Sequence, residues 1–593
     1  MNEADRDRAL ANGWVAALCI AGLVASLYVP AYYAGFVYDD WLHVVDEPVP
    51  ENAGQLVQIF LEPMSPLVPY YRPIPRLLNV AQKAIHGANP LPFHALNLAL
   101  GIACALALRS LLVSRAIGAS PVWAARAAMV FAVHPIAADC IYPIASGRET
   151  LLPTLFTWLA IAAYLQATVR GRTAALLCFA LGLLSKEQAV VTPVLLGLAD
   201  ALRIAPDPPR SAGGWLTRYA PFALVIAGYA ALRHVAVPDA LSPGVALLTA
   251  PAGPVLSLLY DLQTTFAPFA HVVYEPRLEV WWSWPRVGVA CVVASALAWA
   301  ALRTDLRRAA WCLALVVLSL APTANVLVQE TRFAERWGFA ALAGWVGIAV
   351  LALTRAQPLR GARAAVLNAI ALSLAVLSLV RAPEYLSEDA FLARWRESDP
   401  TAAQAWISTG EAAERRGDYD AAVRAYRRVL ALNPDVALAH ASLAIALAEQ
   451  GRLADAQRHA ERALALDPGD AESWSNLGGI RARRGDLAGA VAHYQRALAL
   501  RPRLASAHNN LALALRARGD TAGARAHLEA ALDAQPQFAE AHANLGDLLA
   551  AQGDRAAAER HLARALELDP ELGAARDALD RVRAPRRLPA GAP

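Results

Sequence analysis

Lysine is almost absent from this sequence of 593 residues, which contains only Lys83 and Lys186. Neither lysine follows a glycine, so the G-K-[S/T] loop that binds phosphate in nucleotide hydrolases is missing. No G-x-G-x-x-G stands at a strand-to-helix turn, and the arginines are scattered singly despite a net charge of +4. These absences argue against an ATP-driven pump, a nucleotide-binding Rossmann domain and a nucleic-acid partner.

Cysteine is scarce as well, and its placement excludes two kinds of site. All six cysteines lie before residue 313, mostly inside apolar runs, with no C-x-x-C pair and no spacing typical of metal ligands. We therefore expect them to be core thiols. The sequence predicts no cofactor.

Apolar residues are in excess, and the excess is uneven along the chain. They make up 57% of the sequence, against about 45–50% in soluble domains. Residues 14–381 form one apolar run after another, whereas residues 385–593 alternate Ala and Leu with Arg, Asp and Glu. This change predicts four parts. They are a membrane domain at 1–385, a linker at 386–400, a repeat domain at 401–570, and a capping helix with a disordered tail at 571–593.

Apolar runs of near-spanning length predict a polytopic, all-α membrane domain, because about 20 apolar residues cross a bilayer as a helix. We expect about eleven spans, at 14–33, 93–114, 122–135, 151–169, 173–186, 188–202, 219–237, 286–302, 309–327, 337–354 and 364–381. The first run lacks a small-residue cleavage site, which favours a transmembrane helix over a signal peptide. The apolar stretch 253–272 is assigned to a re-entrant or interfacial segment.

The arginines predict the orientation, because the cytoplasmic loops of membrane proteins are enriched in basic residues. With the N-terminus inside, every inside loop is basic. The arginines of these loops are Arg6, Arg8, Arg115, Arg170, Arg172, Arg203, Arg210, Arg218, Arg303, Arg307, Arg308, Arg355, Arg360 and Arg363. We therefore expect a cytoplasmic N-terminus and an extracytoplasmic repeat domain.

In this orientation, the unusual polar residues of the membrane domain gather at its outer face. They are Asp39, Asp40, Arg72, His94, Asn97, His134, Asp139, Arg148, Glu149, Lys186, Glu187, Asn325, Arg332, Glu335 and Arg336. Ionisable groups at this depth are costly and usually functional. Because they cap helix ends and do not line the bilayer midplane, they favour an enzyme facing the outer leaflet over a transporter.

Two acidic features could carry chemistry. The pair Asp39-Asp40 could provide a general base whose pKa is tuned by its neighbour, or could be an ordinary acidic loop after a helix. The imidazole of His134 with the carboxylates of Asp139 and Glu149 could bind a divalent metal, but their spacing fits no standard site and hydrogen-bonded helix capping is the alternative.

Two cationic residues are candidates to bind an anionic phosphate. Arg148 and Lys186 could both make charge-assisted hydrogen bonds to phosphate oxygens. A lysine is notable in a chain that uses arginine almost everywhere else, although an ion pair with Glu187 explains Lys186 equally well.

Six motifs of the membrane half occur in a fixed order. They are FVYDDW (36–41), YRPIPRLL (71–78), GANPLPFHALNL (87–98), FAVHPIAADCIYPIASGRE (131–149), LLSKEQAVVTPVL (183–195) and APTANVLVQETRFAERW (321–337). As an ordered set, they resemble the transmembrane and tetratricopeptide-repeat proteins of the protein O-mannosyltransferase branch of the GT-C glycosyltransferases. The resemblance covers roughly residues 35–340 and then the repeats.

The resemblance implies a multi-pass enzyme of a bacterial inner membrane that transfers a sugar from a polyprenyl- or dolichyl-phosphate donor. It implies that Asp39 and Asp40 are the acidic pair of the first outer loop, with a catalytic base among them. Residues implied to bind donor phosphate or substrate are Arg72, His94, His134, Asp139, Arg148, Glu149, Lys186, Glu187, Glu335 and Arg336.

The sequence also departs from the family pattern. Ala137 and Asp139 stand where the family has a histidine and a glutamate, and Glu149-Thr150 replaces a lysine-aspartate pair. Residues 337–339 replace a tyrosine-proline stretch. The departures leave the acceptor and the shape of the pocket open.

A 34-residue period organises the C-terminal part. Proline recurs at Pro400, Pro434, Pro468, Pro502, Pro536 and Pro570, and glycine recurs at Gly417, Gly451, Gly485, Gly519 and Gly553. This is the period of the tetratricopeptide repeat, a pair of helices. We predict an α-solenoid of five repeats over 401–570, followed by the solvating cap that such arrays need.

Asn476, Asn510 and Asn544 occupy one position in successive repeats, on the helix face that usually lines the concave groove. A ladder of amides could hold an extended peptide by its backbone. The alternative is that asparagine is a common filler at this position. In either case we expect the solenoid to bind a polypeptide.

These features predict a membrane glycosyltransferase. Asp39 would deprotonate an acceptor hydroxyl, and cationic residues would stabilise the departing lipid phosphate. A single displacement would invert the anomeric centre, and the repeats would recruit a protein acceptor or a partner. Two alternatives remain open: a non-catalytic, membrane-anchored repeat scaffold, and a flippase or transporter of lipid-linked sugars.

Overall fold

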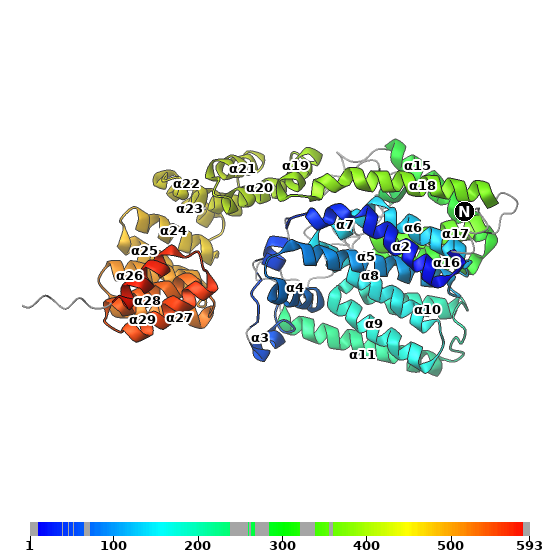
Figure 1. Cartoon of the computed structure of the whole chain (residues 1–593), viewed down its shortest axis with the longest axis horizontal. Helices are drawn as coiled ribbons and strands as arrows, with labels where there is room; N and C mark the ends of the chain where they lie inside the picture. The colour runs from blue at the N-terminus through cyan, green and yellow to red at the C-terminus, as the bar shows by residue number, and fades with distance from the viewer. Residues whose placement is uncertain are drawn as a thin grey trace, which may run out of the picture. The chain divides into compact units, whose positions relative to one another are not determined.

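The computed structural model describes residues 10–37, 40–45, 47–50, 52–63, 71–237, 259, 262–266, 268, 284–320, 338–354 and 360–584 (Figure 1). Within these ranges every regular element is a helix. The chain divides into two compact units, at 1–400 and 401–593. Residues 386–400, expected to be a linker, fall in the first unit, where α19 (Glu388–Ser398) forms a helix of its own.

The first unit is built from long apolar helices. Its main helices are α2 (Gly13–Leu27), α4 (Pro73–His86), α5 (Pro90–Val113), α6 (Pro121–Val133), α7 (Pro135–Ile141), α8 (Ile144–Tyr164), α9 (Val169–Ser185), α10 (Thr192–Ala201), α11 (Ala212–Ala236), α15 (Trp284–Thr304), α16 (Leu306–Leu320), α17 (Phe339–Thr354) and α18 (Arg360–Arg381). Shorter elements are η1 (Val29–Tyr33), η2 (Trp41–Val45), α3 (Ala53–Gln58), η3 (Glu187–Val191) and η5 (Ala382–Tyr385).

All eleven expected apolar segments overlap helices, but few of these helices are long enough to cross a bilayer. Among the described residues, four helical stretches have the length and composition of a span: Pro90–Val113, Ala212–Ala236, Pro285–Thr304 and Ala364–Tyr385. The bent pair α6 and α7 makes a fifth if it counts as one span. The structure therefore supports four or five candidate membrane helices and does not support about eleven.

Short helices, prolines and polar residues account for the difference. α9, α10, α16 and α17 have only 10 to 17 residues. Pro30 follows α2 and turns the expected first span into a 15-residue helix followed by a 3-10 turn. Pro135 separates α6 from α7 with a bend of 63°. α8 has 21 residues but carries Arg148 and Glu149 in its first turns. The expected segment 253–272 lies mostly outside the described residues.

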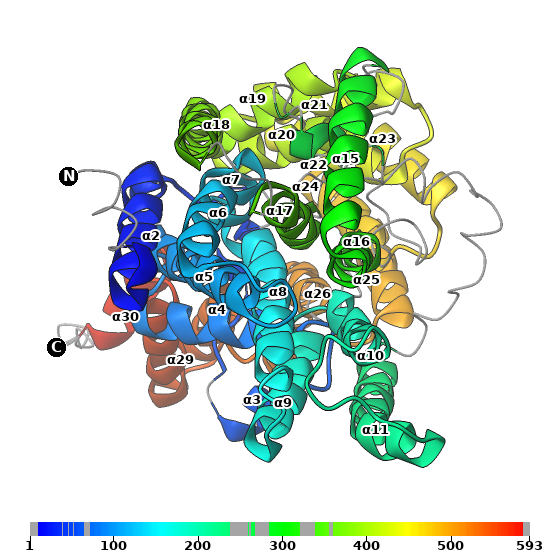
Figure 2. The same cartoon turned by 90° about the vertical axis from the view of Figure 1, so that its right-hand side faces the viewer.

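α8 is the centre of the first unit. It packs against α5 on one side and α9 on the other, and α11 lies beyond α9 (Figures 1 and 2). Most of α8 is buried, including Trp158 and the charged residues near its N-terminus. The polar start of this helix therefore lies inside the packed helices.

The second unit is a regular solenoid of helix pairs. The pairs are α20 (Ala403–Arg415) with α21 (Tyr419–Leu432), α22 (Ala437–Glu449) with α23 (Leu453–Leu466), α24 (Ala471–Arg483) with α25 (Leu487–Leu500), α26 (Ala505–Ala517) with α27 (Thr521–Ala534), and α28 (Ala539–Ala551) with α29 (Arg555–Leu568). Each glycine of the 34-residue series has a positive φ, between 73° and 90°, which the turn within each pair requires. In four of the five pairs the next residue is an aspartate that caps the second helix: Asp418, Asp486, Asp520 and Asp554.

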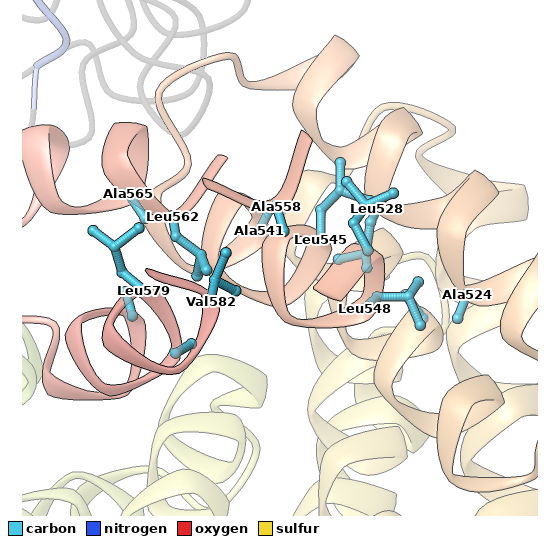
Figure 3. Close-up of a cluster of buried hydrophobic side chains, with 14 of the residues drawn as sticks. Ala524, Leu528, Ala541, Leu545, Leu548, Ala558, Leu562, Ala565, Leu579 and Val582 are labelled. Carbon is cyan, nitrogen blue, oxygen red and sulfur yellow. The ribbon is translucent and has the colours of Figure 1, made fainter. Parts of the chain in front are cut away.

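Small apolar residues hold each pair together. In the last repeats, Leu545, Leu548 and Leu562 pack with alanines of α27, α28 and α29 (Figure 3). Leu579 and Val582 of α30 (Gly573–Arg583) cover the open end of this cluster. α30 is thus the terminal helix that shields the last repeat from water.

Candidate functional site

A buried ion-pair cluster links three segments of the first unit. Arg72, immediately before α4, donates through Nη1 to Glu149 Oε2 on α8, and its Nη2 lies 3.6 Å from Glu187 Oε1 at the start of η3. Arg72 and Glu149 are each 7% exposed, and Lys186 beside Glu187 is 5% exposed. Charges this deeply buried are costly unless they are paired, so these contacts fix the three segments together.

Arg148, the neighbour of Glu149, is fully buried and surrounded by neutral acceptors. Its Nε donates to Asn97 Oδ1 at 3.0 Å, its Nη1 to Asn79 Oδ1, and its Nη2 to Gln82 Oε1 and to the Phe93 carbonyl. All three nitrogens of the guanidinium are therefore engaged within the protein. The Arg148 guanidinium is therefore held in place by neutral groups of α4 and α5.

Asp40 is held by backbone donors. Its Oδ1 accepts from Ala145 N at 2.7 Å and its Oδ2 accepts from Val37 N at 3.1 Å, and the side chain is fully buried. Ala145 lies in the first turn of α8, where a carboxylate also interacts favourably with the helix dipole. Asp40 therefore ties the loop after α2 to the polar end of α8.

The two histidines of the site, His94 and His134, also make hydrogen bonds within the protein. His94 Nε2 lies 3.3 Å from the Gly35 carbonyl. His134 caps α7 by accepting from Ile136 N through Nδ1, and its Nε2 lies 3.0 Å from the Thr265 carbonyl. Both ring nitrogens of His134 are thus used in hydrogen bonds.

Asp139 pairs with a distant tyrosine. Its Oδ1 accepts from the Tyr385 hydroxyl at 2.9 Å, which connects α7 to the end of the first unit. Across the described residues there is no group of three or more His, Cys, Asp or Glu placed to hold a metal ion. With His134 engaged as a helix cap, these contacts provide no metal-ligand set from His134 and Asp139.

Three predicted site residues lie outside the described residues: Asp39, Glu335 and Arg336. Asn325 and Arg332 of the expected outer face lie outside them too. Their roles stay predictions. Sequence reasoning missed Asn79 and Gln82, whose side chains accept from Arg148; their spacing of three residues on α4 places both on one helix face, which was the available signal.

In the repeats, the expected asparagine ladder includes an additional member. Asn476, Asn510 and Asn544 are half-buried at matching positions of α24, α26 and α28. Asn544 Nδ2 donates to Asn509 Oδ1 at 2.8 Å, and Asn509, which the sequence analysis missed, is buried beside Asn510. Part of the ladder therefore bonds internally between successive repeats.

The repeats also contain three histidine pairs that the sequence analysis missed. Their Nδ1 atoms lie 2.9 Å apart in His440–His459, 3.0 Å in His508–His527 and 3.0 Å in His542–His561. The signal was a spacing of 19 residues that recurs with the 34-residue period.

In each pair the first histidine occupies the position of Trp474. The Nε1–H of Trp474 donates to the Pro468 carbonyl at 3.0 Å, and the Nε2 of His440 lies at the same distance from the Pro434 carbonyl. A carbonyl only accepts, so this Nε2 carries the proton. In the neutral pair, His440 Nδ1 then accepts and His459 Nδ1 donates.

Comparison with known proteins identifies the repeats. Two tetratricopeptide-repeat family profiles match, one at residues 387–437, 409–456 and 441–505 and the other at residues 515–582. No curated protein matches the chain. The C-terminal part is therefore a tetratricopeptide-repeat array, whereas no glycosyltransferase family is identified in the N-terminal part, which carries several long apolar helices.

Several solved structures are similar to about 30% of the chain. A thermophilic tetratricopeptide protein of Thermus thermophilus is 24% identical, with 30% of this chain and 98% of that chain covered and a TM-score of 0.29. MamA is 26% identical over 29% of this chain and 93% of that chain, with a TM-score of 0.24. YrrB, described as having an unusual peptide-binding site, is 20% identical over 32% and 96% of the two chains, with a TM-score of 0.24.

Proposed function

We propose that the chain is a membrane glycosyltransferase that transfers a sugar from a polyprenyl- or dolichyl-phosphate donor to an acceptor hydroxyl outside the cytoplasm. The observation that supports this most is the convergence of motifs that are far apart in the sequence. Arg72 contacts both Glu149 and Glu187, so the second, fourth and fifth motifs of the resemblance meet in one buried polar cluster.

Two further contacts bring the remaining described motifs to the same cluster. Asp40 of the first motif accepts from Ala145 at the start of α8, and Asn97 of the third accepts from Arg148. A convergence of this kind is what an active site assembled from loops and helix ends requires.

The contacts also divide the roles within the site. Asp40 is fixed by two backbone donors, so we assign it to orient the loop and assign proton abstraction to Asp39. Arg148 is enclosed by neutral acceptors, so we assign binding of the donor phosphate to Lys186 with Arg72. Glu335 and Arg336 stay assigned to the site on the resemblance alone.

The tetratricopeptide array is proposed to recruit the polypeptide acceptor or a partner. In the proposed orientation the N-terminus is cytoplasmic and the array lies on the same side of the membrane as the buried polar cluster. This orientation rests on arginine placement.

Transfer of labelled sugar from a polyprenyl-phosphate donor by the purified full-length protein tests the proposal. Asp39→Asn keeps the size of the side chain but cannot accept a proton, so the rate should fall about 10²- to 10⁴-fold. Lys186→Ala should mainly raise the donor concentration needed for half-maximal rate. Arg483→Met, in an exposed ion pair of the repeats, is the matched control and should leave the rate unchanged.

Two outcomes would reject this mechanism. Transfer by Asp39→Asn at the wild-type rate would remove the proposed base, and no transfer by the wild type across donors and acceptors would favour the non-catalytic scaffold. The scaffold has one observation on its side, because Asp40 and Arg148 have their hydrogen bonds satisfied within the protein.

A further inference from the structure

A second concentration of charge lies at the opposite ends of the same helices. The buried polar cluster contacts α5 near its N-terminus, at Asn97, whereas Arg115 follows its C-terminus. Arg115 follows Asn97 by 18 residues, which is about 27 Å at 1.5 Å per residue and comparable to a hydrocarbon core of about 30 Å. The two charged regions are thus separated by roughly the thickness of a membrane.

The charged residues at this end line a cavity of about 240 Å³. Its lining comes from three segments that are far apart in the sequence: Arg115 after α5, Arg203 and Ile204 after α10, and Asp305 with Arg307 and Arg308 at the start of α16. We call it the arginine pocket. The sequence analysis assigned all three segments to the cytoplasmic side.

The pocket has more positive charge than its own carboxylate can balance. Asp305 lies 3.5 Å from Arg308 Nε and also caps α16 by accepting from Arg308 N at 3.2 Å. Within the described ranges, no carboxylate lies within ion-pair distance of Arg115, Arg203 or Arg307. Three guanidinium groups therefore remain available to one anion.

Arg203 occupies a backbone position that normally selects glycine. Its φ is 55°, and Ile204 N donates to the Ala199 carbonyl at 2.8 Å while Arg203 N donates to the Asp200 carbonyl at 3.0 Å. These two bonds form a Schellman cap with Arg203 at the left-handed residue, where a side chain costs about 1–2 kcal/mol. The chain thus places a guanidinium at the pocket at the expense of local backbone strain.

Gly118 makes room for another of the arginines. A Cβ at this residue would lie 2.8 Å from Arg308 Nη1, and its φ of 70° already favours glycine. The loop after α5 therefore accommodates the Arg308 side chain at the pocket.

We propose that the arginine pocket binds a phosphate group. Arginine forks match phosphate oxygens in geometry and charge, and basic pockets between membrane helices on the cytoplasmic side take anionic lipid headgroups. The phosphate comes from an anionic phospholipid of the inner leaflet or from a free phosphate compound. The pocket is separate from the donor site of the proposed transferase, and its occupation does not depend on sugar transfer.

The test measures phosphate binding by the full-length protein with two probes. In the first arm, inorganic phosphate is titrated into detergent-purified protein against chloride at equal ionic strength, and the melting temperature is recorded. In the second arm, the protein is reconstituted in phosphatidylcholine with or without phosphatidylglycerol, and retained lipid is measured by native mass spectrometry after extraction. A lipid headgroup gives retention of phosphatidylglycerol with little response to inorganic phosphate, and a free phosphate ligand gives the reverse.

Arg203→Gly separates binding from folding. Glycine relieves the left-handed strain, so the melting temperature without ligand should stay the same or rise, while binding of the effective probe should weaken about five-fold. Arg307→Gln should weaken it by a similar factor. Because both arginines bind the same anion, the two changes together should weaken binding more than either one alone, without a simple product of the two factors.

Arg210→Gln is the matched control, because Arg210 is exposed in the same loop as Arg203 but does not line the pocket. It should bind like the wild type. If Arg210→Gln and Arg203→Gly weaken binding of the probe equally, the binding comes from the overall positive charge of the surface around the pocket. That result would overturn the proposal. Unchanged binding of both probes by Arg203→Gly and Arg307→Gln, or no binding by the wild type, would overturn it too.

Discussion

The two units of this chain are both all-helical in the described residues, but they are held together by contacts of different range. In the repeats, the pairing of helices follows the sequence, with each helix packed on its immediate neighbours. In the first unit, the polar contacts that fix the helices join residues far apart, such as Asn97 with Arg148 and Asp139 with Tyr385. Helices are thus held together by regular packing between neighbours in the second unit, and additionally by polar contacts between distant segments in the first.

The difference follows from where the charges lie. Ion pairs of the repeats are exposed, as in Arg483–Glu449 at 2.7 Å, where the side chains are 43% and 42% exposed. The corresponding pair in the first unit, Arg72–Glu149, is almost completely buried. Exposed pairs contribute little because water screens them, whereas a buried pair cannot lose one partner without leaving an uncompensated charge.

The largest expected effect tests this contrast directly. Arg72→Met keeps much of the side-chain volume but leaves Glu149 and Glu187 without their cation, so it should destabilise the first unit by about 3–5 kcal/mol. Arg483→Met removes a cation from an exposed pair and should cost less than about 1 kcal/mol. Thermal unfolding of the full-length protein in detergent, followed by near-UV circular dichroism, measures both.

A second variant checks the cause. Arg72→Met/Glu149→Gln also neutralises the carboxylate that Arg72 binds directly and leaves Glu187 beside Lys186, so it should recover most of the stability lost in Arg72→Met. If the single change costs no more than Arg483→Met, the contrast between the two units fails. If the double change is no more stable than Arg72→Met alone, the loss comes from packing and not from charge.

The next effect concerns the close packing within one repeat. A Cβ at Gly478 would lie 2.7 Å from Tyr494 Cε1, so Gly478→Ala should destabilise the repeat array by about 1–3 kcal/mol through overpacking. The adjacent Gly479 offers the control, because its Cβ would lie at an ordinary 3.6 Å from Tyr494 Oη. Gly479→Ala should stabilise the helix by up to about 1 kcal/mol. Urea unfolding of residues 401–593 measures both, and equal effects of the two changes would contradict close packing at Gly478.

The range of the contacts also explains how far the sequence alone could predict this molecule. In the repeats, Pro434 and Gly451 recur every 34 residues, so boundaries, turns and helix pairing all follow from local signals, and the family matches confirm the repeat type. In the first unit the apolar segments were found, but the helix lengths were not, because features such as Pro30 end a helix inside a run that hydropathy alone reads as continuous.

The candidate site divides in the same way. That Arg72, Glu149 and Glu187 share one face was predicted from the expected topology, and these three residues do meet. The hydrogen bond from Arg148 to Asn79 could not be predicted, because nothing in the sequence indicates that α8 packs against α4. Hydrophobic patterning orients a helix towards the core but does not select its neighbour.

The smallest expected effect is a pH dependence of the stability of the repeat array, which arises from histidine pairs in the second unit. The pKa of His459 is lowered mainly by burial and next by the positive charge that His440 carries when it is protonated. The pKa values of His527 and His561 are lowered for the same two reasons, with His508 and His542 as their partners. Arg427 and Arg458 add to this lowering at His459, and Asp455 opposes it. At His527 Asp520 opposes the lowering; at His561 Arg525 and Arg560 add to it and Glu529 opposes it.

The sign of the pH effect follows from these shifts. Because the pKa is lowered, each of the three histidines binds its proton less tightly in the folded array than in the unfolded chain, where the pKa is about 6.5. Their contribution to stability is therefore complete above about pH 6.5 and is lost as the pH falls through the lower folded pKa. A second proton on a pair also places two Nδ1–H donors against each other, which breaks the contact of about 3 Å between the rings.

Thermal melting of residues 401–593 from about pH 8 to about pH 5 should show this loss. The first repeat supplies the matched replacement, since Ala425 stands where the later repeats have histidine. His459→Ala/His527→Ala/His561→Ala should melt lower at neutral pH but lose much less stability on acidification, because the groups with lowered pKa are gone. A parallel decline of the variant and the wild type would assign the pH dependence to other groups and remove the histidine pairs as its cause.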